Sequence, residues 1–207
     1  MKAWLEHGNF ISRFLVQFHL ISNFYEAIEN PDAECFRPMA GLTVDGACMH
    51  EPIAANRYRA DLAMPILSSL EAVAGRTLLP RARGESPAEW SLRAYLAPWV
   101  LLAHDGGLDP CFTYANRTAQ TLFERPWADL VGLPSRYSAE PDAREARAAL
   151  LERVRRDGYC DDYAGVRVAA SGRRFRIAGA TVWNLRDDLG HHRGQAAQFS
   201  QWTYLDH

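Results

Sequence analysis

The sequence predicts an α+β fold in which a five-stranded antiparallel sheet carries helices on one face and is preceded by N-terminal helices. Three observations predict it. Two short apolar runs, 99–103 and 111–114, have the length and flanking turns of strands. Capped helical patterns follow them as far as Gly158. Beyond Gly158 the hydrophobic period changes from about 3.6 to about two, and turn residues at 171–172 and 187–190 divide the remainder into three hairpin-linked strands.

The first segment places apolar side chains three or four positions apart over residues 9–29, which predicts a helix. The following stretch to residue 55 contains several prolines and glycines without a period, so we expect an irregular linker. We therefore expect residues 1–50 to form an N-terminal helix and linker, and residues 55–205 to form one domain.

Two interpretations of residues 1–48 stay open. The helix could serve dimerisation of the domain. Alternatively translation starts at Met49, and residues 1–48 are upstream translation. A shift in charge composition near Met49 suggests both interpretations. The regular apolar stripe favours the first, and the second is favoured because the family resemblance described below does not extend before about residue 50.

Helices inside the domain are predicted from their ends. The pattern over 53–74 is helical and stops at Gly75, which suits a left-handed C-cap. Ser86, followed by proline and by an acid three positions later, has the form of a capping box. Asn116 has the position of an N-cap, and a longer helix is expected over 142–156.

Composition and charge exclude several classes of protein. The 207-residue chain is 48% hydrophobic, which is enough to bury a core and argues against disorder. A formal net charge of -2 provides no general attraction for nucleic acid or anionic membranes. The apolar run after Phe10 is broken by polar residues, so neither a signal peptide nor a membrane span is expected. Four scattered cysteines lack zinc spacing and indicate free thiols, which favours the cytoplasm.

The order of two strands, small helices, a longer helix and three strands resembles a PAS domain. Short sequence motifs also resemble those of the MEKHLA family, a PAS-like group, over roughly 55–205. The matching motifs are 109–110 (DP), 114–117 (YANR), 133–136 (LPSR), 138–141 (SAEP), 162–163 (DY), 165–167 (GVR), 172–175 (GRRF), 180–184 (ATVWN), 194–197 (GQAA) and Trp202. In plants the family is similar to the C-terminal part of homeodomain–leucine-zipper regulators, but this sequence contains nothing like their DNA-binding part.

The resemblance implies a non-enzymatic sensory, regulatory or protein-interaction module. PAS domains hold ligands between the sheet and the small helices, which implies a small ligand here, an unknown protein partner and a possible homodimer. The ligand-binding residues expected on this basis are Tyr114, Asn116, Phe123, Trp127, Tyr137, Phe175, Ile177, Trp183 and Phe199. A closed core made of the same apolar residues is the alternative.

Other chemistries find little support. A small enzyme of unknown reaction on the same scaffold is the alternative function, but no buried acid or base is evident. No cofactor is indicated: a flavin–thiol photoreceptor would need a cysteine between Asn116 and Arg117, and the helical stretch 134–157 contains no axial histidine for haem. The pair His191 and His192 fits a solvated hairpin turn better than a metal site.

Five arginines, Arg117, Arg136, Arg167, Arg174 and Arg176, form the most conspicuous polar set of the predicted domain. Arg167 lies on one hairpin strand, and Arg174 and Arg176 share a face of the next. Because the guanidinium group forms a planar fork that binds carboxylates and phosphates, one interpretation is an anion-binding patch. The other is a set of ordinary ion pairs with Glu140 and the acids at 161–162.

Overall fold

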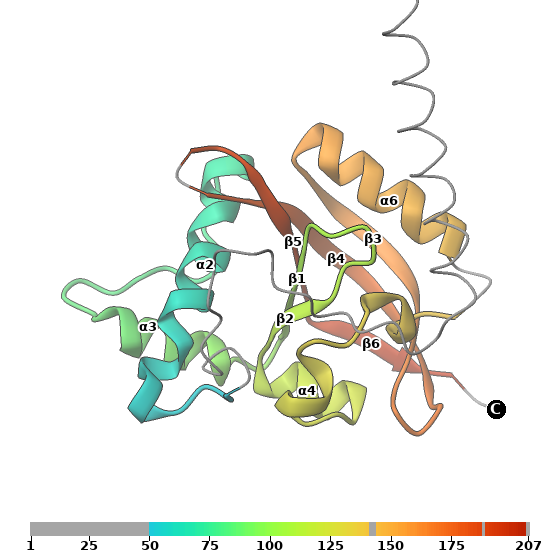
Figure 1. The fold of residues 1–207 in the computed structure, drawn as a ribbon, viewed down its shortest axis with the longest axis horizontal. Coiled ribbons are helices and arrows are strands. Elements are labelled where there is room, and N and C mark those ends of the chain that lie inside the picture. The colour runs from blue at the N-terminus through green and yellow to red at the C-terminus, as the bar shows by residue number, and fades with distance from the viewer. Residues whose placement is uncertain (1–49, 141–143, 188, 206–207) are drawn as a thin grey trace, which may run out of the picture. The chain divides into compact units, whose positions relative to one another are not determined.

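The computed structural model describes residues 50–140, 144–187 and 189–205 (Figure 1). They belong to the second of two compact units into which the chain divides, Pro38–His207. The helix predicted over 9–29 lies outside the described residues. Within those residues, no helix is both long enough and apolar enough to cross a membrane.

The centre of the domain is an antiparallel sheet. Its strands are β1 (Val100–Asp105), β2 (Phe112–Ala115), β3 (Tyr159–Val168), β4 (Arg174–Arg186), β5 (His192–Phe199) and β6 (Gln201–Tyr204). The order is β2-β1-β5-β4-β3, so β2 and β3 are its edges, and β6 pairs with the first part of β4. The predicted antiparallel sheet is confirmed. The last predicted strand is divided at Ser200, because its two parts have different neighbours: β5 pairs with β1 and β4, whereas β6 pairs with β4 alone.

Helices cover both faces of this sheet. They are η2 (Ala54–Arg59), α2 (Ala60–Ala74), α3 (Pro87–Tyr95), α4 (Arg117–Phe123), α5 (Trp127–Leu130), η3 (Ser135–Ser138) and α6 (Arg144–Asp157). Figure 1 shows α2 and α3 on one side of the strands and α4 and α6 on the other. The expected helical layer is that of α4, η3 and α6, and the N-terminal helices α2 and α3 cover the opposite face.

Two apolar layers follow from this arrangement. On what we call the α2 face of the sheet, Leu101 and Trp183 pack in one cluster with Leu67 and Leu70 of α2. On the α6 face, Leu102, Ile177 and Phe199 pack with α4. A smaller cluster on the same side joins Val154 of α6 to Val182. Because both faces are covered, residues 100–103 of β1 and 180–184 of β4 are buried without alternation, whereas the edge strand β3 is mostly half-buried or exposed.

The predicted helix ends are found where the capping residues lie. Ser86 and Glu89 form the expected capping box, in which the backbone N–H of Ser86 donates to the Glu89 carboxylate at 2.8 Å. Gly75 ends α2 in the left-handed region with a φ of 66°.

One predicted helix is interrupted. The pattern over 53–74 is not continuous, because Arg57, Tyr58 and Arg59 have φ values of 54°, 53° and 52°. Such left-handed residues are costly for side chains with a Cβ atom. The buried Arg59 guanidinium pairs with Asp61 at 2.7 Å and anchors the turn to α2, which therefore begins only at Ala60.

The side chain of Asn116 joins three elements in the core. It is fully buried, and its Oδ1 accepts hydrogen bonds from Ala119 N in α4 and Leu101 N in β1, both at 3.0 Å. Its Nδ2 donates to Trp99 O at 2.7 Å and to Ala94 O of α3 at 3.3 Å. The predicted N-cap is confirmed, and its amide also satisfies backbone groups that would otherwise be buried without partners.

Substituting Asn116→Ala is expected to lower the free energy of unfolding by about 2–4 kcal/mol, because it removes a cap and leaves buried backbone groups unpaired. The matched control Ser86→Ala removes an exposed N-cap and should cost only about 1 kcal/mol. Urea unfolding followed by circular dichroism measures both. Equal losses in the two variants would contradict the role assigned to the buried amide.

Candidate functional site

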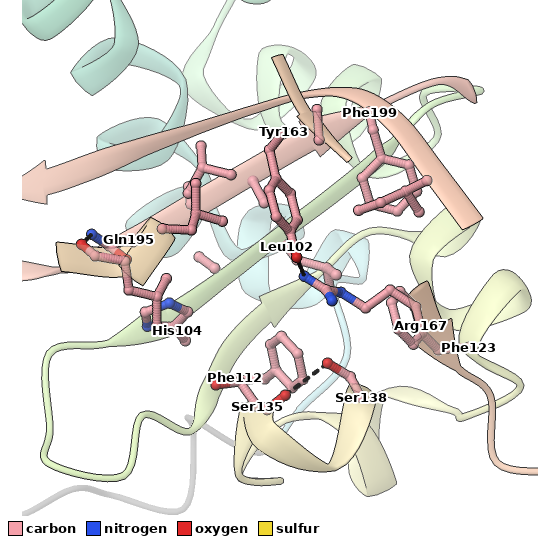
Figure 2. A pocket seen from close by; sticks show the side chains of 18 residues that line it. Leu102, His104, Phe112, Phe123, Ser135, Ser138, Tyr163, Arg167, Gln195 and Phe199 are labelled. Carbon is pink, nitrogen blue, oxygen red and sulfur yellow. Dashed lines mark hydrogen bonds between the residues drawn. The ribbon is translucent and has the colours of Figure 1, made fainter. Parts of the chain in front are cut away.

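The α6 face of the sheet encloses a pocket with a cavity volume of about 60 Å³. It lies between the strands and the helices η3 and α6, and Figure 2 shows its lining side chains. The lining residues are Leu102, Ala103, His104, Phe112, Phe123, Ser135, Ser138, Leu150, Leu151, Tyr163, Arg167, Ile177, Ala180, Val182, Gln195, Ala196, Ala197 and Phe199. They include no aspartate or glutamate, so in the described structure an anion in the pocket would meet no lining carboxylate.

A β-bulge at Gly179 decides which side chains of β4 reach the pocket. Between the pairs Gly165↔Ile177 and Tyr163↔Ala180, β4 has one residue more than β3. Gly179 takes up the distortion with a φ of 59°. As a result Ile177 faces the pocket, and beyond the bulge Val182 takes that face while Trp183 points to the opposite one.

A second register shift acts on the short edge strand β2. It lies between Ala103 and His104 in the pairing of β1 with β2. As a result Phe112 lines the pocket, whereas Tyr114, two residues later, packs in the cluster of the α2 face. A regular strand would have placed both rings on one side.

Three of the residues expected from the sequence line the pocket together. They are Phe123 at the end of α4, Ile177 in β4 and Phe199 in β5. Phe175 is buried in the same cluster and meets the Phe123 ring edge-on at 5.2 Å between centroids, but it does not line the cavity.

Three others belong to the cluster of the α2 face. The indole Nε1 of Trp183 donates to Ser69 Oγ of α2 at 2.9 Å. Tyr114 and Trp127 meet edge-on at 5.7 Å, and the Tyr114 hydroxyl and Trp127 Nε1 have no hydrogen-bond partner among the described residues. Burial raises the pKa of Tyr114, so its hydroxyl stays protonated.

The remaining two expected residues have other surroundings. Asn116 is occupied by the four backbone bonds described above. Tyr137 is 42% exposed and lies beneath the guanidinium of Arg136, which is 4.6 Å from the ring centroid. Neither residue lines the pocket.

Sequence reasoning missed most of the polar lining. His104, Tyr163 and Gln195 come from three different strands, and only their register brings them to one cavity (Figure 2). Gln195 is 3% exposed, but nothing in the mixed sequence of β5, HRGQAAQF, distinguishes this buried glutamine from an exposed one. Its Nε2 donates to Asn184 Oδ1 and to Leu151 O, both at 3.1 Å, which ties β5 to β4 and α6.

The arginines of the predicted patch separate in the structure. Arg174 is paired with Glu140, as the ion-pair interpretation expects. Asp161 and Asp162 pair instead with Arg76 and Arg153, which are not arginines of the predicted patch. Arg167 differs, because its guanidinium lines the pocket.

The hairpin histidines lie at an exposed turn whose described residues do not form a metal centre. His191 Nδ1 lies 3.2 Å from Asp187 Oδ2 at the exposed turn between β4 and β5. Among the described residues, no three histidine, cysteine, aspartate or glutamate side chains are grouped so as to hold a metal ion. Neither of the described cysteines, Cys111 and Cys160, forms a disulfide within the described part of the chain.

The family of the chain follows from a match that covers nearly the whole described domain. The model of the MEKHLA domain matches residues 60–204. The chain belongs to the MEKHLA domain family. Its domain carries the strand and helix order that the sequence predicted as PAS-like.

Individual relatives are distant. The homeobox-leucine zipper protein ATHB-9 of Arabidopsis thaliana is 25% identical over 96 residues, which is 46% of this chain but 11% of that protein. A PAS domain of a Colwellia psychrerythraea protein is 11% identical and has a TM-score of 0.48, covering 56% of this chain and 92% of that one. The fungal blue-light photoreceptor Vivid, in its light-state dimer, is 15% identical with a TM-score of 0.47, covering 65% and 90% of the two chains.

The bulge can be tested at Gly179. An added Cβ would meet nothing within 4 Å, so the cost of a substitution there comes from the backbone conformation alone. Gly179→Val should lower the free energy of unfolding by about 1–2 kcal/mol, and Gly179→Asn by less, because asparagine tolerates the left-handed region. Equal losses in urea unfolding would argue against a left-handed residue at this position.

Proposed function

We propose that this MEKHLA domain is a non-enzymatic sensory module that binds a small molecule in the pocket on the α6 face and transmits binding to α2. The observation that carries the proposal is the course of β4, which contributes Val182 to the pocket and, at the next residue, Trp183 to the contact with α2. A displacement of β4 by a ligand therefore acts on the packing of the opposite face.

The mechanism is a shift between two packings of helix against sheet. A ligand that prefers one of them moves the equilibrium by the difference between its two affinities. The Trp183–Ser69 hydrogen bond is a polar link between β4 and α2, and its geometry changes when β4 moves. In this proposal a partner protein recognises the α2 side. A homodimer through the segment predicted at 9–29 is a further part of the proposal, and that segment lies outside the described residues.

Filling the pocket tests ligand binding. Ala197→Leu adds three carbon atoms to a lining residue of β5 and should weaken any bound fragment roughly tenfold or more, since overfilling a packed site costs about 1–3 kcal/mol. The control Ala178→Leu makes the same change on β4 outside this pocket and should leave binding intact. A screen of fragment-sized molecules by NMR on the full chain supplies the ligands. Hits that bind Ala197→Leu and the unmodified chain equally would refute the site.

Breaking the link tests transmission. Ser69→Ala removes the acceptor of the buried Trp183 indole and is expected to cost about 1–3 kcal/mol of stability. A pocket ligand should still bind, but its effect on amide hydrogen exchange in α2 should disappear. Ser68→Ala, at the exposed neighbouring position, is the matched control and should keep that effect. If the ligand still changed amide hydrogen exchange in α2 of the Ser69→Ala variant, transmission through the Trp183–Ser69 hydrogen bond would be contradicted.

A further inference from the structure

We infer that the ligand of this pocket carries a carboxylate, which the guanidinium group of Arg167 binds. The inference rests on the proposed function, because it takes the pocket as the ligand site. Arg167 stands on β3, and Figure 2 shows its side chain reaching between the sheet and the turn formed by Ser135 and Ser138. Its side chain is half-buried.

The contacts of Arg167 are with neutral groups. Its Nη1 donates to Val166 O and its Nη2 to the Tyr163 hydroxyl, both at 3.0 Å. The guanidinium carbon also lies 5.2 Å from the centroid of the Tyr163 ring. No carboxylate forms an ion pair with it in the described part of the chain, whereas nearby Arg153 and Arg174 each have one.

A cation in such surroundings favours an anionic partner. Removing a charge from water is costly unless a counter-charge and hydrogen bonds replace the solvent. The guanidinium has more N–H donors than these two contacts use, and its planar fork matches the two oxygens of a carboxylate. The Tyr163 hydroxyl accepts from Arg167 and can donate its own proton to the same carboxylate.

Tyr163 holds this arrangement in place. A Cβ atom on Gly165 would lie 2.5 Å from the Tyr163 hydroxyl, so the ring occupies space over the strand that a side chain at residue 165 would take. The folded ring then stacks against Arg167 and directs the guanidinium along the cavity. The contact with Tyr163 therefore fixes the position of the Arg167 side chain at the cavity.

The rest of the cavity fixes the size and character of the ligand. Most of the wall is apolar, with Phe112, Ile177 and Phe199 among its members. A cavity volume of about 60 Å³ accommodates about four to six water-sized groups, since each takes about 10–15 Å³. The class that fits is a short monocarboxylate with an apolar chain, and butyrate is a suitable probe.

The test compares butyrate with butyramide, its neutral isostere, by calorimetric and NMR titration of the full chain. Butyrate should bind the unmodified chain and perturb pocket resonances, and butyramide should bind roughly 10- to 100-fold more weakly. Arg167→Met should weaken butyrate by a similar factor without changing butyramide binding. Arg176→Met, an exposed arginine that does not line the pocket, is the control and should bind butyrate as the unmodified chain does.

Two outcomes would overturn the inference. If butyrate and butyramide bind the unmodified chain equally, the pocket is a ligand site but does not select an anion. If neither probe binds, the carboxylate inference fails, and the fragment screen with Ala197→Leu decides separately whether the pocket binds ligands. Should Arg167→Met not fold, the contrast between the two probes on the unmodified chain still decides.

Discussion

The extra residue in β4 is the constraint on which the two sides of this domain depend. Because side chains alternate along a strand, one inserted position exchanges the faces of every residue that follows it. With the bulge at Gly179, small residues such as Ala180 face the helices α4–α6, and Trp183 is free to fill the space beneath α2. Without the bulge, the Trp183 indole would occupy the region that now contains the cavity. The bulge at Gly179 therefore leaves a cavity on the α6 face and lets the indole fill the α2 face.

Local rules of capping and turn formation account for what the sequence predicts well. The box at Ser86 and Glu89, the cap at Asn116 and the end of α2 at Gly75 each depend on a few neighbouring residues. The left-handed turn ending at Arg59 could not be predicted in this way, because it includes no glycine that would indicate a left-handed conformation. The contacts that stabilise it come from packing, which residue propensities do not contain.

The candidate site was predictable only in part, for a reason that concerns volume. Large aromatic side chains indicate where a core lies, and most of the predicted ligand-binding residues are of this kind. A cavity forms instead where the side chains are too small to meet, as at Ala180 and Ala197, and this depends on register between strands distant in the sequence. Arg167 was noticed as a charge on a strand, but periodicity could not distinguish a solvated position from one beside a cavity.

The long edge strand β3 has a consequence for solubility. An open edge of ten residues offers unpaired backbone groups to another strand, which is a route to aggregation. Here the pairing of β3 is irregular on both sides of Tyr163, and charged residues occupy the first irregularity, at Asp161 and Asp162. A second strand approaching this edge would find neither a regular ladder nor an apolar surface. The edge is thereby protected from adding further strands, although no other strand of the described structure covers it.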